Sequence, residues 1–284
     1  MTMSHARTSA RQAAPPPFPA AAHAPLVRSR RGWAAVLTLN RPSTRNALSE
    51  DVLRALAAEL DAISRDAAVR AVILASAGPV FSAGHDLKEV TARRADPDRG
   101  RAYFADLMDL CSSVMTRLVR LPQPVIAAVE GTATAAGCQL VASCDLAVAS
   151  EDARFSTPGV HIGLFCSTPM VALSRNVAPK HAMEMLLLGE AVDAATAHRI
   201  GLVNRVCPAG AALEEALGLA EVIGSKSAST VATGKRTFYE QAEMELDDAY
   251  RYAGRVMVEN MLSRDAAEGI DAFVQKRQPT WTGA

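Results

Sequence analysis

The sequence lacks the residue patterns that mark several common classes of protein. Its five cysteines include no CxxC pair and are odd in number, so we expect a reducing compartment and no disulfide framework. The six histidines show no HExxH or HxxxH spacing, so no metal site is predicted, and the sequence contains neither a P-loop nor a GxSxG elbow. No apolar run reaches the roughly 20 residues of a membrane helix. The formal net charge of zero argues against nucleic acid or a charged membrane surface as the main partner.

Acidic residues are missing from the N-terminal part of the chain, where none precedes Glu50. Residues 1–30 also hold a proline cluster, Pro15–Pro17 and Pro19, and show neither strand nor helix periodicity. This composition predicts a disordered tail, and we expect a cytoplasmic protein. Arginines without acids also suit a mitochondrial transit peptide, which would place the protein in the matrix, but the prolines would interrupt a long amphipathic helix.

What is present is a chain of 284 residues, 49% of them hydrophobic, which is enough for one large folded domain. We expect the folded part to begin at Trp33. Short buried strands at 34–39 and 71–75 alternate with amphipathic helices, the first of which starts after Ser49 as its N-cap. Beyond Pro208 the pattern is helical only. The sequence therefore predicts an α/β fold with a spiral or parallel sheet and a helical C-terminal part.

The stretch Val125–Asp145 carries the most informative local pattern. It opens as an apolar strand, turns at Gly131 and enters a small-residue helix near Ala136, an order that exposes backbone N–H groups at the turn. The stretch Phe81–Lys88 has the same character, because Gly84 there follows another buried strand. Two such turns can together supply a pair of N–H donors to one carbonyl oxygen. The sequence therefore predicts a site for an oxygen anion that is built from backbone groups.

Four ordered motifs give the chain a family resemblance. They are NRPSTRNAL at Asn40–Leu48, FSAGHDL at Phe81–Leu87, GTATAAGCQLVASCD at Gly131–Asp145 and EGIDAFVQKR at Glu268–Arg277. In this order and spacing they resemble the crotonase superfamily, the enoyl-CoA hydratase/isomerase proteins, over most of the chain. Any one of these motifs alone would be a weak signal, whereas the ordered set is specific.

The resemblance implies a repeated ββα spiral core over residues 31–207 and a helical oligomerisation module over residues 208–284, with trimers or dimers of trimers. It implies acyl-CoA thioesters as ligands, with coenzyme A as part of the substrate and no separate cofactor. It assigns an oxyanion hole to the backbone N–H groups of His85 and Ala136, which would stabilise an enolate by about 3 kcal/mol per donor. Contacts with coenzyme A are implied for seven positions, the last two often supplied by a neighbouring subunit: Arg45, Ala47, Asp86, Leu87, Lys88, Phe273 and Lys276.

Two positions depart from the family pattern. Hydratases of the family carry one glutamate after the Gly-Cys of the central helix and another after the proline of the following loop, and here these positions hold Gln139 and Gly159. Addition of water to a double bond needs a base for the water and an acid for the α-carbon, and neither an amide nor a hydrogen atom can serve. Residues 164–168 are changed as well, so we expect an altered acyl pocket and weak or undetectable hydration.

Three further side chains of the site have competing interpretations. We expect His85 to act through its N–H rather than its imidazole. His161 and Cys166 lie in the altered loop and would serve a thioesterase-like hydrolase, although structural roles are commoner for such residues. The leading interpretation is an acyl-CoA protein of fatty-acid metabolism, a lyase or isomerase that works through an enolate if it is catalytic. The alternatives are a non-catalytic acyl-CoA binder or assembly subunit and, as a third, the hydrolase.

Overall fold

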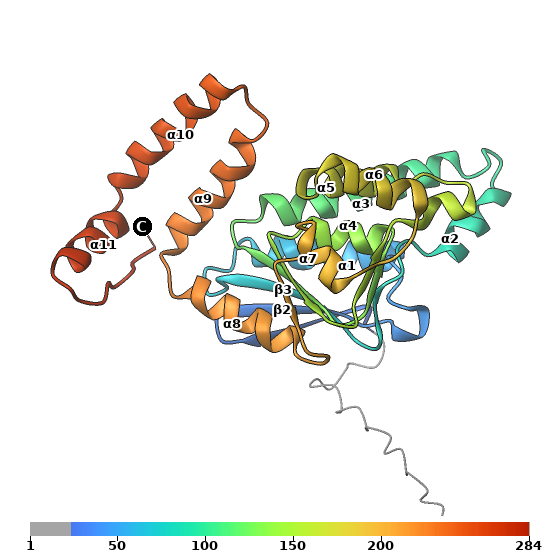
Figure 1. The fold of residues 1–284 in the computed structure, drawn as a ribbon, viewed down its shortest axis with the longest axis horizontal. Coiled ribbons are helices and arrows are strands. Elements are labelled where there is room, and N and C mark those ends of the chain that lie inside the picture. Colours follow the sequence, from blue (N-terminus) through green and yellow to red (C-terminus); the bar gives the residue numbers. More distant parts are fainter. Residues whose placement is uncertain (1–23, 284) are drawn as a thin grey trace, which may run out of the picture.

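The computed structural model describes residues 24–283, in which the strands form two sheets (Figure 1). One sheet has the order β1-β2-β3-β5-β7-β10 and the other the order β4-β6-β8-β9. Neighbouring strands are parallel, except that β1 pairs with β2 and β8 with β9 in antiparallel fashion. The strands are β1 (Leu26–Arg31), β2 (Ala34–Leu39), β3 (Ala71–Ser76), β4 (Val80–Ser82), β5 (Val125–Val129), β6 (Thr132–Thr134), β7 (Leu146–Ser150), β8 (Arg154–Ser156), β9 (Val192–Asp193) and β10 (Arg205–Cys207).

Helices cover the sheets and continue beyond them. Helices α1 and α3 pack against each other on one side, while α8 covers the opposite face of the six-stranded sheet (Figure 1). A short 3₁₀ helix, η3 (Pro158–Ile162), follows β8. The α-helices are α1 (Glu50–Ile63), α2 (Leu87–Ala92), α3 (Arg101–Arg120), α4 (Ala136–Ala142), α5 (Ser167–Asn176), α6 (Pro179–Leu188), α7 (Ala194–Arg199), α8 (Ala212–Gly224), α9 (Ala228–Gln241), α10 (Leu246–Met261) and α11 (Arg264–Val274).

The core winds through a repeated strand–strand–helix unit. In each of the pairs β3–β4, β5–β6 and β7–β8, the first strand joins the six-stranded sheet and the second joins the four-stranded sheet. A helix follows each pair: α2 after β4, α4 after β6, and η3 with α5 after β8. The predicted α/β class and the ββα spiral that the family resemblance implied are therefore confirmed.

The six-stranded sheet is covered on both faces, which explains why every residue of β2 is buried and why five of its six residues are apolar. Leu37 and Leu39 of β2 belong to the cluster that contains the inner faces of α1 and α3. Val36, between them, belongs instead to a second cluster with Ala216 and Ala220 of α8. Because successive side chains of a strand point to opposite faces, a strand covered on both sides needs apolar residues at every position.

The N-terminal boundary of the fold differs from the prediction. Strand β1 begins inside the segment 1–30 that was predicted to be disordered, so that prediction is wrong for residues 26–30; residues 1–23 lie outside the described part. The outward side chains of β1 are basic, and Arg28 binds Glu59 at 3.4 Å and Asp66 at 2.9 Å. An edge strand with a charged outer face shows little apolar alternation, which is why the sequence pattern concealed it.

Three shorter elements were also not predicted from the sequence. Strands β4 and β6 span three residues each, too few for a recognisable alternation. Helix α2 was not predicted either, and its start is fixed by the side chain of Asp86, which accepts the backbone N–H of Lys88 at 2.9 Å.

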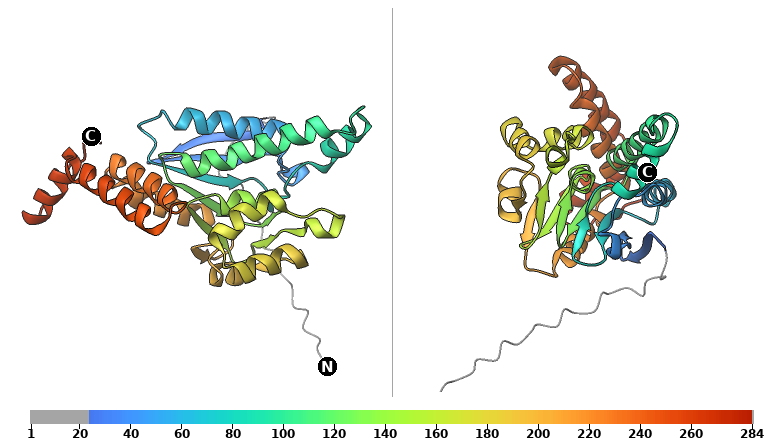
Figure 2. Two further views of the ribbon diagram at one scale, coloured as in Figure 1. Left: turned by 90° about the horizontal axis from the view of Figure 1, so that it is seen from above. Right: turned by 90° about the vertical axis from the view of Figure 1, so that its right-hand side faces the viewer.

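Helices α9–α11 form a C-terminal module that stands away from the sheets (Figures 1 and 2). Its anchor is Lys235 of α9, whose Nζ donates to Asp145 at 2.6 Å and to the carbonyls of Leu118 and Gln123 at 2.9 and 3.2 Å. Tyr239 donates its hydroxyl to the same carboxylate at 2.9 Å. Burial lowers the pKa of Lys235 and the facing Asp145 opposes that effect. Because removal of one member would leave a buried charge without a partner, this cluster ties α9 to the core.

A second buried carboxylate holds the two ends of the module together. Asp265, at the start of α11, accepts hydrogen bonds from the Ser227 hydroxyl at 2.6 Å and from the backbone N–H groups of Thr282 and Gly283 at 2.7 and 3.0 Å. Burial alone would raise the pKa of Asp265, but these hydrogen bonds outweigh it and lower the pKa to about 2. The carboxylate thus joins the N-cap of α9, the start of α11 and the C-terminal segment.

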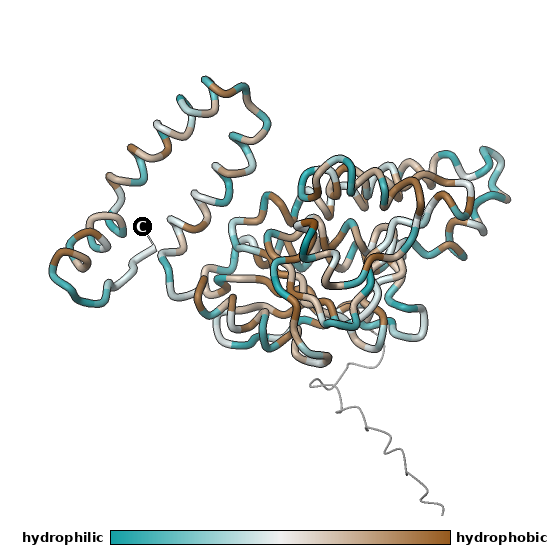
Figure 3. Tube along the Cα trace, viewed as in Figure 1, coloured by the Kyte–Doolittle hydropathy of each residue, from teal (hydrophilic) through white to brown (hydrophobic). Residues whose placement is uncertain are grey.

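The C-terminal module exposes much of its apolar surface. Figure 3 shows hydrophobic stretches along α10 and α11 although neither helix packs on the sheets. No helix of residues 24–283 is both long enough and apolar enough to cross a membrane. Exposed apolar surface of this extent is typical of a contact with another protein surface. The exposed apolar residues of α10 to α11 are Leu246, Tyr250, Met257, Val258, Met261, Leu262, Ile270, Phe273 and Val274.

Candidate active site

Three turns lie at one edge of the four-stranded sheet, where β4, β6 and β8 end. Since these strands are parallel neighbours, the segments that follow them leave the sheet side by side. The first turn is Ala83–His85, the second Ala135–Ala136 and the third Thr157–Gly159. The second turn is joined to the end of β8, just before the third turn, because the Ala135 N–H donates to the Ser156 carbonyl at 2.9 Å.

Gly84 allows the first two turns to approach each other. Its φ is +82°, and a Cβ at this position would lie 2.9 Å from the Ala135 Cβ and 3.2 Å from the Ala136 nitrogen. His85 follows immediately, so its N–H and that of Ala136 lie on adjoining turns. Within residues 24–283, neither of these two N–H groups donates a hydrogen bond to the chain. The structure thus presents two free backbone donors close together, as an oxyanion-binding site requires.

The second turn holds a residue in a rarely populated backbone conformation. Ala135 has φ 51° and ψ −120°, a backbone conformation that costs residues other than glycine about 1–3 kcal/mol. Its hydrogen bond to Ser156 and the close packing of Gly137, whose Cβ position would lie 2.4 Å from the Ser82 carbonyl, keep the turn in place. Ala135 directly precedes Ala136, so its strained conformation sets the orientation of the Ala136 N–H.

The two positions of the family glutamates differ in their surroundings. Gln139 lies in α4, is 5% exposed, and its Oε1 has no hydrogen-bond partner in the described chain. Gly159 has no positive φ, but a Cβ there would meet the Leu164 carbonyl at 2.9 Å and the Cys166 Sγ at 3.0 Å. A side chain at position 159 is therefore opposed by the packing of the loop rather than by backbone conformation. Position 139 holds a buried polar side chain, whereas position 159 has no space for one.

The imidazole of His85 is held in a buried, neutral state. Both ring nitrogens are inaccessible to solvent and have no hydrogen-bond partner in residues 24–283. Burial lowers the pKa of the ring, with a smaller opposing effect from the backbone of Leu48. The buried ring therefore favours its neutral form beside the N–H donors.

His161 and Cys166 do not form a nucleophile–base pair. His161 is exposed, and its Nε2 lies 2.9 Å from the Leu188 carbonyl at the end of α6. The thiol of Cys166 is buried beside Gly159, and burial raises its pKa. A protonated, buried thiol without an adjacent imidazole is a poor nucleophile. No group of three or more His, Cys, Asp or Glu side chains in the described chain is arranged to hold a metal ion.

Five of the predicted coenzyme A contacts surround the first turn. The Arg45 carbonyl accepts the Ala83 N–H at 3.0 Å, and Leu48 donates to the Gly84 carbonyl at 2.7 Å, so the segment 45–48 runs beside this turn. On the other side, Asp86 caps α2, which begins with an exposed Leu87 and Lys88. The five residues that this arrangement brings together are Arg45, Ala47, Asp86, Leu87 and Lys88.

The other two predicted contacts lie elsewhere in the same chain. Phe273, which is 85% exposed, is in α11, and Lys276 follows that helix. Figures 1 and 2 place α11 at the end of the molecule opposite α2. Within one chain, therefore, Phe273 and Lys276 do not join the site at the three turns.

Two polar residues of the site were not recognised in the sequence. The hydroxyl of Ser82 donates to the Asn46 carbonyl at 2.8 Å and accepts the Gly84 N–H at 3.3 Å, so it supports the first turn. Thr157 opens the third turn; it is 1% exposed, and its hydroxyl has no partner in residues 24–283. In the sequence, only its position between a short strand and a proline could have drawn attention to Thr157, and that position indicates a turn residue rather than a ligand-binding residue.

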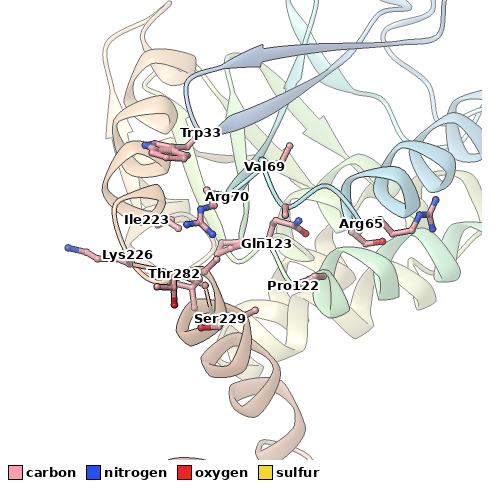
Figure 4. Close-up of a pocket in the computed structure, with 17 residues that line it drawn as sticks. Trp33, Arg65, Val69, Arg70, Pro122, Gln123, Ile223, Lys226, Ser229 and Thr282 are labelled. Carbon is pink, nitrogen blue, oxygen red and sulfur yellow. The ribbon is translucent and has the colours of Figure 1, made fainter. Parts of the chain in front are cut away.

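A cavity of about 540 Å³ lies apart from the three turns, between the core and the C-terminal module (Figure 4). Its lining includes Trp33, Arg70 and Gln123 from the core, and Lys226 and Thr282 from the C-terminal part. Arg70 lies over the Trp33 ring, 5.7 Å from its centre. None of the predicted site residues lines this cavity, so it is separate from the candidate active site.

Comparison with known proteins gives concordant results. The family model described as enoyl-CoA hydratase/isomerase matches residues 31–284. The enoyl-CoA hydratase domain-containing protein 3, mitochondrial, of Rattus norvegicus is 48% identical over 248 residues, which cover 87% of this chain and 80% of the relative. The probable enoyl-CoA hydratase of Rhizobium meliloti is 36% identical over 254 residues, with 89% of this chain and 96% of the relative covered.

One solved structure with a similar fold is a Mycobacterium smegmatis enoyl-CoA hydratase, which is 50% identical in sequence. The match covers 90% of this chain and 98% of the other, with a TM-score of 0.86. The structure of human enoyl coenzyme A hydratase domain-containing protein 3 shows 45% identity, with 90% of this chain and 100% of the other covered, and a TM-score of 0.86. The similarity thus extends over nearly all of the described chain, including the C-terminal module.

Proposed function

The chain belongs to the enoyl-CoA hydratase/isomerase family, as its motifs indicated, and we propose that it binds acyl-CoA thioesters and stabilises their enolates with the N–H groups of His85 and Ala136. The observation that carries this proposal is the pair of free donors on adjoining turns, which the close approach at Gly84 makes possible. Such donors bind an enolate oxygen more strongly than a ground-state carbonyl, and each contributes about 3 kcal/mol to the transition state.

Ordinary hydration is not the proposed activity. Each general acid or base typically contributes 10² to 10⁴ in rate, so the loss of both carboxylates leaves a deficit of roughly 5 to 11 kcal/mol. Gln139 cannot exchange a proton at neutral pH, and Gly159 is enclosed by the Leu164 carbonyl and Cys166. The activity that remains is chemistry of the enolate itself, within a lyase or isomerase of fatty-acid metabolism, with no separate cofactor.

Two other functions receive less support. A non-catalytic acyl-CoA binder or assembly subunit would keep the fold for its ligand, but it would not need the strained Ala135 that aims the Ala136 donor. A thioesterase-like hydrolase would need a reactive Cys166 or a free His161, whereas the thiol is buried and the imidazole is bonded to the Leu188 carbonyl.

We further propose that the functional unit is a homotrimer or a dimer of trimers. Phe273 and Lys276 are remote from their own chain's first turn, and the C-terminal module carries exposed apolar side chains on α10 and α11. A neighbouring subunit that covers this surface would bring Phe273 and Lys276 to the coenzyme A path that Arg45 and Lys88 begin. The adenine would then contact Phe273, and the phosphates would bind the lysine ammonium groups.

The animal relatives supply a proposal for the compartment. The name of the Rattus norvegicus relative includes the word mitochondrial, and so does that of the Homo sapiens relative. This supports the mitochondrial matrix, the alternative that the acid-free N-terminal sequence left open, over the cytoplasm. Fractionation of cells that produce the full chain, followed by mass spectrometry of its N-terminus, tests both the location and any cleavage.

The test of the proposed function measures proton exchange at C2. Butyryl-CoA incubated with the protein in D₂O should acquire deuterium at C2, and calorimetry should show binding of butyryl-CoA but not of free butyrate. The variant Lys276→Ala should weaken binding, whereas Lys226→Ala, a change outside the proposed path, should not. Binding without exchange would indicate the acyl-CoA binder, and the lack of binding to any acyl-CoA would refute the proposal.

A further inference from the structure

The cavity between the core and the C-terminal module is lined by charges of one sign only. Its volume of about 540 Å³ lies within the range of roughly 300–1,000 Å³ that is usual for small-molecule sites. Three basic residues line it, Arg65, Arg70 and Lys226, whereas no aspartate or glutamate of residues 24–283 does. A cleft that is lined by one sign of charge raises the local concentration of the opposite ion. The cavity therefore attracts anions.

The described part of the chain supplies no acidic partner for these three cations. None of them forms a salt bridge within residues 24–283. Two acids next to the lining already have other partners. Asp66, which follows Arg65, binds Arg28 at 2.9 Å, and Asp265 accepts the Thr282 N–H at 2.7 Å. The positive charge of the cavity is therefore left for a ligand.

Arg70 is the most constrained of the three cations. It is half-buried, and its guanidinium carbon lies 5.7 Å from the centre of the Trp33 ring, within the range of a cation–π contact. This contact limits the positions of the side chain. A guanidinium group offers parallel N–H donors that match the two oxygens of a carboxylate. In Figure 4, Arg70 lies near the middle of the lining, with Lys226 and Arg65 toward opposite ends.

Most of the remaining lining residues are apolar. The core contributes Val69, Pro122 and Pro124, and the C-terminal part contributes Ile223 of α8 and Val231 of α9. A small inorganic anion would contact the cations and leave these walls in water. An anion with a hydrocarbon chain would also cover the walls, and each buried CH₂ group should tighten its binding about fourfold. The lining therefore fits an anion with an apolar body better than a free phosphate.

We propose that this cavity is a second ligand site, which binds an organic carboxylate with an apolar chain, such as a medium-chain fatty acid. The carboxylate binds the Arg70 guanidinium, and the chain packs on the apolar walls. The ligand contacts both the core and the C-terminal module. Among the core residues is Gln123, whose carbonyl accepts the Lys235 Nζ of the α9 anchor at 3.2 Å. The site shares no residue with the oxyanion hole, so it does not depend on the proposed function.

Calorimetry of the full chain with octanoate tests this site. Octanoate should bind more tightly than inorganic phosphate, and butyrate, which is four CH₂ groups shorter, should bind about 250-fold more weakly. Arg70→Gln should weaken octanoate binding about tenfold or more, whereas Arg70→Lys, which keeps the charge but not the paired donors, should weaken it less. Arg94→Gln is the matched control, because Arg94 is exposed and lies outside the cavity, and this variant should bind octanoate normally.

Two lysine variants separate this site from the candidate active site. Lys226→Ala should weaken octanoate binding about threefold or more and leave butyryl-CoA binding unchanged, whereas Lys276→Ala should do the reverse. Lys226 is exposed, so its replacement tests the site even if an Arg70 variant fails to fold, which circular dichroism would show. Saturating butyryl-CoA should not displace octanoate; displacement would assign octanoate to the acyl pocket and overturn the second site.

Three other results would also contradict the second site. The absence of binding at millimolar octanoate would overturn it, whether or not butyryl-CoA binds. Equal affinities of a folded Arg70→Gln variant and the natural protein for octanoate would remove the assigned role of the guanidinium. Phosphate that binds as tightly as octanoate would overturn the ligand class, because the apolar walls would then contribute nothing.

Discussion

Replacement of Gly84 by alanine tests how the two N–H donors are brought together. The glycine has φ +82°, and an added Cβ would lie 2.9 Å from the Ala135 Cβ and 3.1 Å from the Thr134 carbonyl. Both atoms belong to the segment that carries the Ala136 donor. The alanine methyl group must therefore push the first and second turns apart, or the backbone at position 84 must change its conformation. Either response moves the His85 N–H relative to the Ala136 N–H.

The expected magnitude has two parts. A residue other than glycine in the left-handed region costs about 1–2 kcal/mol, and the insertion of a methyl group into a filled space costs about 1–3 kcal/mol. The free energy of unfolding should thus fall by about 2–5 kcal/mol. Misplacement of one oxyanion donor typically lowers kcat by roughly 10²- to 10³-fold. The rate of enolate formation should therefore fall by more than the fraction of unfolded protein can explain.

Gly210→Ala is the matched control for this substitution. Gly210 has the same φ, +82°, but no atom lies within 4 Å of its Cβ position. It should lose only the conformational part of the stability, about 1–2 kcal/mol, and keep the full rate of C2 deuterium exchange on butyryl-CoA. Thermal unfolding and the exchange rate are measured on both variants. If Gly84→Ala exchanges as fast as Gly210→Ala at a temperature where both are folded, the geometric reasoning is wrong.

Four further predictions concern other positions. Gln139→Glu should raise hydration of crotonyl-CoA, whereas Gly159→Glu should lower the melting temperature through its overlap with the loop; a stable Gly159→Glu protein would contradict the packing argument. The pKa of Asp265 in the folded protein is about 2, below the usual 3.8, so this carboxylate contributes stability that is complete above pH 4 and is lost as the pH falls toward 2. The natural protein should therefore lose more stability over this pH range than the Asp265→Asn variant does. Equal losses would refute the assignment. Phe273→Asp should shift the protein toward monomers in light scattering and weaken acyl-CoA binding; an unchanged trimer that binds acyl-CoA normally would exclude the proposed subunit contact.

The larger elements of the fold could be predicted because their burial is periodic. In α1, the buried residues Leu53, Leu56 and Leu60 recur at helical spacing, and Ser49 caps the helix by accepting the Val52 N–H. The same reasoning failed for β1, where Arg28 and its neighbours cover the outer face. It also failed for the three-residue strands β4 and β6, which carry the first two turns of the site but are too short to show a period.

The candidate site could be predicted only in part. A glycine after a strand indicated the turn at Gly84. The approach of that turn to Ala136, however, depends on two strands that are about 50 residues apart in the sequence. The pairing of His85 with Ala136 was therefore predicted only from the family resemblance. The unpartnered hydroxyl of Thr157 and the blocked space at Gly159 depend on the surrounding loop. Both are properties of packing, and a single sequence does not contain them in readable form.

The most direct measurement of the central claim is the infrared stretch of a ¹³C-labelled thioester carbonyl in bound butyryl-CoA. If the His85 and Ala136 N–H groups both donate to this oxygen, the stretch should move to a lower frequency than in free butyryl-CoA, and Gly84→Ala should reverse most of the shift. A carbonyl that binds to the protein at its free frequency would contradict the account, because no oxyanion hole would then be in contact with the substrate.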